Sequence, residues 1–158
     1  MKHPLFAALL GLGLAGNSLA ATKDYTFSSF TATSDKTRCE GTVSVSLSGS
    51  PSVTKTRFTG KSGSHKPSNV NLSVGSRSDD TTPTGSDGSW AGSTNAFNGS
   101  AFSNGTWKMT IKPIGALPGS VTAGTPPKPT PAAPARPSTG STLVTCNSFE
   151  GTVLTFEY

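Results

Sequence analysis

The sequence of 158 residues is poor in the side chains that carry catalysis, with two histidines, two cysteines and eight acidic residues. His3 lies within the first twenty residues, which have the features of a cleaved signal peptide. In the mature chain a Ser-His-Asp triad would therefore depend on His65 alone. No Gly-x-Ser-x-Gly motif supplies a nucleophile, and no glycine-rich nucleotide loop is present. One histidine and two distant cysteines are too few ligands for a zinc site without carboxylates. We therefore predict no catalytic residues, no cofactor and no bound metal.

Acidic residues leave two alternatives open. A glycosidase needs two carboxyl groups facing each other across a cleft, and the spacing of the eight acids shows no such pair. Asp79 and Asp80, with Asp87 seven positions further on, form the weaker alternative of a calcium-binding loop. Residues that serve the geometry of a turn are the favoured interpretation of these three aspartates.

Strong helix formers are scarce, whereas serine and threonine supply 24 and 23 residues. Apolar and polar residues alternate with a period of two in three segments, which lie at 43–48, 70–74 and 107–111. One buried face and one exposed face are typical of antiparallel strands. Weaker candidate strands lie at Tyr25–Phe30, Val53–Phe58, Ala96–Phe102, Leu143–Cys146 and Thr152–Tyr158. This pattern predicts an all-β fold, an antiparallel β-sandwich of the jelly-roll type.

Aromatic residues have two alternative roles in this fold. Trp107 is in phase with the apolar residues of its strand, so we predict that it lies in the core. Trp90, Phe97 and Phe102 could line a sugar-binding platform, but a chain with only 8% aromatic residues needs them for its core. The core is therefore the favoured location for all three.

Two segments are predicted to lie outside the strands. Ser76–Ser89 is polar and rich in turn residues, which favours a long loop. Eight of the twelve prolines lie between Pro113 and Pro137, so we predict a proline-rich insertion at about 113–140. Asn104-Gly105 predicts a tight turn before the Trp107 strand.

The first twenty residues have the features of a signal peptide. Lys2 and His3 are followed by an apolar run from Leu5 to Ala15, and residues 18–20, Ser-Leu-Ala, form a small-x-small cleavage site. The apolar run is shorter than the roughly 20 residues that span a bilayer, which disfavours a retained anchor. We predict a signal peptide at 1–20 and a single domain at 21–158, without a transmembrane segment in the mature chain. Its location would be extracellular, periplasmic or on the cell surface.

Export would place Cys39 and Cys146 in an oxidising compartment. Two thiols outside the leader most simply form one disulfide, which would join positions 107 residues apart. A redox or metal-binding pair would need much closer spacing. The predicted bond therefore connects the front of the domain to its last strands.

Basic residues are concentrated in one part of the sequence. Lys55, Arg57, Lys61 and Lys66 lie within a dozen residues, and the first two share one face of a candidate strand. Such a cluster favours an anionic partner. We therefore predict a secreted, non-catalytic β-sandwich module with a binding or structural role in the envelope or outside the cell. The alternatives are a protein that binds an anionic polymer, either polysaccharide or nucleic acid, and a small secreted carbohydrate-active enzyme. A second secreted protein is the other class of partner.

Two segments of the sequence resemble a known family. Residues 96–111, AFNGSAFSNGTWKMTI, and residues 151–156, GTVLTF, are similar to segments of the P domain. This domain is the jelly-roll β-sandwich attached to kexin-like proprotein convertases and bacterial subtilisin-type proteases. The chain departs from the family at Pro113, where the family usually has aspartate, and it has no space for a protease domain. The resemblance implies a non-catalytic sandwich whose relatives support or regulate an attached enzyme.

Overall fold

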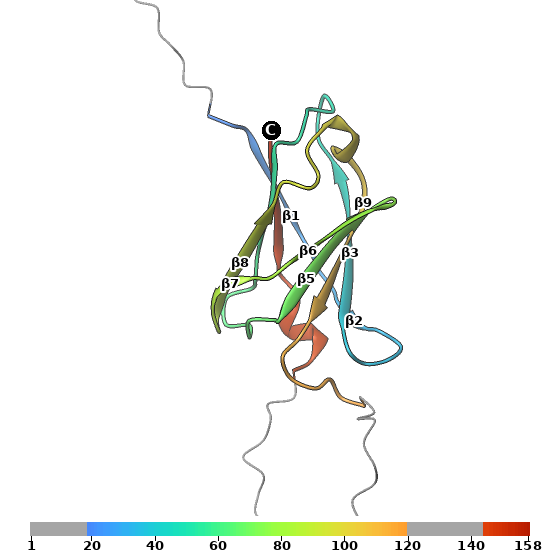
Figure 1. Cartoon of the computed structure of the whole chain (residues 1–158), viewed down its shortest axis with the longest axis vertical. Coiled ribbons are helices and arrows are strands. Elements are labelled where there is room, and N and C mark those ends of the chain that lie inside the picture. Colours follow the sequence, from blue (N-terminus) through green and yellow to red (C-terminus); the bar gives the residue numbers. More distant parts are fainter. Residues whose placement is uncertain (1–18, 120–143) are drawn as a thin grey trace, which may run out of the picture.

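The computed structural model describes residues 19–119 and 144–158, in which short strands form two stacked sheets (Figure 1). Hydroxyl residues on one side of each strand and apolar residues on the other let each sheet bury one face. The elements in chain order are β1 (Thr22–Thr26), β2 (Thr31–Ala32), β3 (Cys39–Ser46), β4 (Lys55–Thr59), β5 (Asn69–Val74), β6 (Arg77–Thr81), β7 (Thr84–Ser86), β8 (Ser89–Thr94), the 3₁₀ helix η1 (Ser100–Phe102), β9 (Asn104–Lys112), the 3₁₀ helix η2 (Cys146–Phe149) and β10 (Val153–Glu157).

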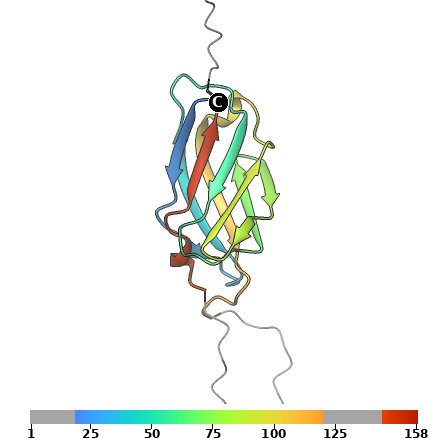
Figure 2. The ribbon, with the colours of Figure 1, turned by 90° about the vertical axis from the view of Figure 1, so that its left-hand side faces the viewer.

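In the described part of the chain each sheet has five strands, in the orders β1-β10-β4-β8-β7 and β2-β3-β9-β5-β6. Every pairing is antiparallel. Figure 2 shows the first sheet, with β1 in blue beside β10 in red. The predicted all-β antiparallel sandwich is therefore confirmed.

The core between the sheets is built from aromatic rings. Trp107 is fully buried and lies edge-on to Phe97 and Phe156, with ring centroids 4.7 and 5.0 Å away. Trp90 is only 2% exposed, and its indole packs against Phe58 and Phe149. The predicted core positions of Trp107, Trp90 and Phe97 are confirmed. Phe102 is partly buried against the core, so these rings form no exposed sugar platform.

The predicted disulfide is also confirmed. Cys39 is the first residue of β3 and Cys146 is the first residue of η2, and the bond joins their sulfur atoms. Both cysteines are buried. The bond therefore attaches the segment that precedes β10 to the sheet that contains β3.

Several predicted boundaries are wrong. Ser76–Ser89 is not one long loop, because β6, β7 and the start of β8 lie within it. β6 consists of polar residues, but its backbone completes the open edge of β5, and this pairing outweighs weak strand propensity. Ala96–Phe102 is a connection that ends in η1. The predicted Leu143–Cys146 strand is wrong at Cys146, which belongs to η2, while Leu143 lies outside the described residues.

Asn104-Gly105 forms no turn but lies at the start of β9, paired with the end of β3. Gly105 has a φ of 144°, and a Cβ atom at this position would lie 3.2 Å from Cγ2 of Val74. Glycine here lets β9 take a conformation that other residues rarely adopt beside a close neighbour. The predicted turn at Asn104-Gly105 is therefore wrong, since both residues are paired within the sheet.

The proline-rich insertion predicted at about 113–140 is described only as far as Gly119. Pro113 leaves the end of β9, and Leu117 is buried against the core. The prolines from 126 to 137 lie outside the described residues, as does the leader up to residue 18. No helix within 19–119 and 144–158 has the length and apolar character needed to cross a membrane.

Candidate functional site

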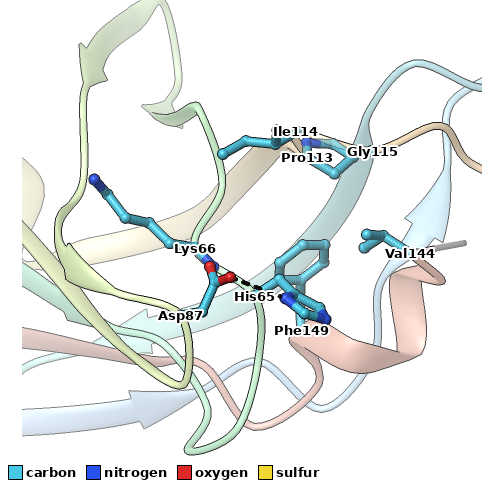
Figure 3. A pocket seen from close by; sticks show the side chains of 8 residues that line it. All are labelled: His65, Lys66, Asp87, Pro113, Ile114, Gly115, Val144 and Phe149. Atoms are coloured by element: carbon cyan, nitrogen blue, oxygen red, sulfur yellow. Dashed lines mark hydrogen bonds and ion pairs between the residues drawn. The ribbon is translucent and has the colours of Figure 1, made fainter. Parts of the chain in front are cut away.

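A pocket lies at the end of the sandwich beside η2 (Figure 3). Its volume of about 360 Å³ is within the range of small-molecule sites. Phe149, at the back of the pocket, is fully buried, whereas Ile114 at the rim is 75% exposed. The lining residues are His65, Lys66, Asp87, Pro113, Ile114, Gly115, Val144 and Phe149.

A histidine and a carboxylate meet at the mouth of this pocket. His65 Nδ1 lies 3.4 Å from Oδ2 of Asp87, and the backbone N–H of Lys66 donates a hydrogen bond of 3.0 Å to Oδ1. Backbone hydrogen bonds from Gly63 to Gly88 and from Gly88 to Ser64 hold the two loops together. No local pattern indicates this pair, because its members are 22 residues apart in different loops.

The chemistry of the pair is limited by its surroundings. A carboxylate beside imidazole Nδ1 orients the ring so that Nε2 can accept a proton, as in hydrolases. However, the lining residues within 19–119 and 144–158 include no serine, threonine or cysteine. The described part of the chain therefore gives this pair no side-chain nucleophile within the pocket. The arrangement suits binding of a group with an apolar body and a polar end.

Acid is expected to destabilise the fold through two exposed aspartates. The Lys66 backbone N–H and then the His65 side chain lower the pKa of Asp87, and the Thr33 hydroxyl with Thr37 lowers the pKa of Asp35. A carboxyl group whose pKa is lowered in the folded state stabilises the fold at pH values above its ordinary pKa of 3.8. This stabilisation is lost as the pH falls below 3.8 and through the lowered pKa of the folded state. The midpoint temperature of thermal unfolding, measured between about pH 2.5 and 7, should therefore change less with pH in the double variant Asp35→Asn with Asp87→Asn than in the wild type. An identical pH dependence in this variant and the wild type would contradict the expectation.

A second hollow is an open groove along β8 on the outer face of the first sheet. Its volume is about 490 Å³, and its lining residues are Lys55, Arg57, Thr81, Thr82, Thr84, Ala91, Gly92 and Ser93. The register explains its shape: Arg57 pairs with Ser93, and Thr84 pairs with Ala91. The small residues of β8 form the floor, with long basic side chains of β4 on one side and threonines on the other. We call this hollow the β8 groove.

The basic wall of the β8 groove is held by an ion pair. The Arg57 guanidinium contacts the carboxylate of Glu157 on the neighbouring strand β10. The Glu157 side chain is 18% exposed and that of Arg57 is 52% exposed, so the carboxylate anchors a guanidinium that remains accessible. Lys55 has no ion-pair partner among the described residues. One positive charge in excess of the nearby acid therefore remains at this wall.

The four basic residues grouped by the sequence are divided between two regions. Lys55 and Arg57 line the β8 groove, whereas Lys66 lines the pocket beside Asp87. The Lys61 side chain lies over Gly151, beyond the end of β4. The hydroxyl groups opposite Lys55 and Arg57 were missed, because they belong to the segment that was predicted to be a loop.

The three aspartates of the calcium alternative do not converge. Asp79 and Asp80 are adjacent on β6, so their side chains point to opposite faces. Asp80 accepts a hydrogen bond from Asn71, and Asp87 lies at the pocket with His65. Within the described ranges, no group of three or more His, Cys, Asp or Glu side chains is placed to hold a metal ion.

A third hollow lies where the β5–β6 hairpin meets the start of β9. It includes Arg77, whose guanidinium lies 5.7 Å from the centre of the Phe102 ring. This distance is within the range of a cation–π interaction. The contact uses the guanidinium to cover an aromatic ring at the edge of the core.

Comparisons of the chain with family models, curated proteins and solved structures found no match.

Proposed function

We propose that this chain is an exported, non-catalytic β-sandwich module that binds a ligand in the cell envelope or outside the cell. The observation that carries the proposal is the point at which the fold begins. The Tyr158 backbone N–H donates to the carbonyl of Ala21, and β1 begins at the next residue. Leu19, within the proposed cleavage motif, is 91% exposed. Cleavage after Ala20 would therefore remove the leader without removing a residue of the sandwich.

The disulfide supports the same proposal. Structural disulfides persist in secreted and periplasmic proteins and are rare in the reducing cytosol. The bond between Cys39 and Cys146 is part of the core, and its formation requires an oxidising environment.

The resemblance to the P domain fits a module of this kind. Residues 96–111 contribute η1 and most of β9, and residues 151–156 contribute most of β10. If the resemblance reflects common ancestry, the module would support or regulate a secreted enzyme, in keeping with a protein partner. Co-purification of the exported chain with a secreted hydrolase would favour this more specific role.

Export should be visible as a defined mature product. Expression of the full chain in a bacterial host is expected to yield a 138-residue product (158 − 20) in the periplasm or medium, beginning at Ala21. Its intact mass should show both cysteines oxidised. Ala20→Arg should block cleavage, because signal peptidase requires a small residue there, whereas Leu19→Gln should not. A full-length, reduced protein in the cytosol would contradict the proposal.

A further inference from the structure

We infer that the β8 groove binds an acidic polysaccharide, a chain of sugars that carries carboxylate or sulfate groups. This inference rests on the proposed function, because it names the ligand of the exported module. The first argument is shape. The groove follows β8, and its floor is formed by Ala91, Gly92 and Ser93 between larger side chains. An open groove parallel to an extended strand suits an extended polymer.

The second argument is the chemistry of the two walls. One wall has two cations, Lys55 and Arg57, which together can pair with anionic groups. The other wall has three threonines, Thr81, Thr82 and Thr84, of which the Thr81 hydroxyl donates to a carboxylate oxygen of Asp79 at 3.4 Å. The Thr84 hydroxyl donates to the carbonyl of Ala91, so its oxygen can still accept a hydrogen bond. Cations on one side and hydroxyl groups on the other match a ligand that has both acidic groups and hydroxyl groups.

The third argument distinguishes this ligand from other polyanions. Among the described residues, no aromatic side chain lines the β8 groove, so this part of the chain lacks the stacking surface used by proteins that bind single-stranded nucleic acid. The guanidinium of Arg57 is oriented by Glu157, which limits the entropy lost when it contacts an anion. Glu157 also keeps the net charge of the wall low, so the wall lacks the dense positive charge with which proteins bind nucleic acid.

Binding can be measured by isothermal titration calorimetry with the mature chain and three probes: polygalacturonate, dextran sulfate and neutral dextran. At least one acidic probe is expected to bind, with an affinity that falls as salt increases, and neutral dextran is expected not to bind. The carboxylate and sulfate probes identify which acidic group is preferred. The double variant Lys55→Gln with Arg57→Gln should weaken binding by about tenfold or more, because charge-assisted hydrogen bonds are lost.

The matched control removes the same charge elsewhere. The double variant Lys61→Gln with Lys112→Gln also lacks two positive charges, and Lys112 lies at the end of β9 in the other sheet. We expect its affinity to remain within about twofold of the wild type, since surface charges far from the ligand are screened. Equal losses in both double variants would overturn the inference in favour of diffuse attraction. Absence of binding to both acidic probes, or tighter binding to single-stranded DNA, would also overturn it. None of these results would affect the export proposal, which is tested by cleavage and location.

Discussion

Replacement of both Cys39 and Cys146 by alanine is expected to lower the free energy of unfolding by about 4–5 kcal/mol. The bond closes a loop with a sequence separation of 107 residues, and the chain-entropy relation gives about 4.7 kcal/mol for a loop of that order. This is a large part of the roughly 5–15 kcal/mol that stabilises a typical domain. Urea unfolding followed by tryptophan fluorescence measures the change. Alanine is the better replacement because both positions are buried, and a serine hydroxyl there would need a partner.

Reduction of the wild-type bond provides the control for this prediction. Reduced wild-type protein should lose about as much stability as the variant, because the cross-link is absent from both. The loss should also be seen at the pocket, since η2 begins at Cys146 and ends at Phe149. Hydrogen exchange should therefore become faster in η2 before it does in β9. A decrease below about 1 kcal/mol would contradict the expected role of the bond.

Trp107→Ala is expected to cost about 3–5 kcal/mol, since it removes the ring at the centre of the core. The Trp107 ring is fully buried and contacts the rings of Phe97 and Phe156. The protein should still unfold cooperatively, at a lower urea midpoint. A loss of less than about 1 kcal/mol would mean that the core does not depend on this ring.

Phenylalanine variants test a finer difference between the two tryptophans. Trp107 Nε1 is buried and has no hydrogen-bond partner among the residues that the structure describes, whereas Trp90 Nε1 donates to the Ser64 hydroxyl at 2.8 Å. Trp107→Phe removes an unpaired polar group, but Trp90→Phe breaks a buried hydrogen bond. We therefore expect Trp90→Phe to be the more destabilising by about 1 kcal/mol. The opposite order in urea unfolding would contradict this explanation.

The strands that were predicted correctly are those in which local pattern and burial agree. In the segments that became β3, β5 and β9, apolar residues recur at every second position, and the structure buries that face. β6 and β7 were missed, because their side chains are polar on both faces. Their backbones pair with β5 and β8, which are themselves fixed by the core. Polar edge strands of this kind have little signal of their own.

The candidate site depended even more on tertiary structure. The sequence placed Lys55 and Arg57 on one face of a strand, and the structure confirms this alternation at β4. It could not place Thr82 or Thr84 opposite them, because the polar composition of that segment favours a loop. The same limit applies to the pocket, where Asp87 meets His65 through the contact of two loops.

The sequence by itself determined the all-β class, the central tryptophan and the disulfide. The period of two follows from strand geometry, which is local, and two cysteines allow only one intramolecular pairing. Only the tertiary structure decided which residues form the β8 groove and the pocket. These hollows are formed by segments brought together by sheet order and loop packing, and such long-range contacts arise from burial of the common core, which no local pattern records.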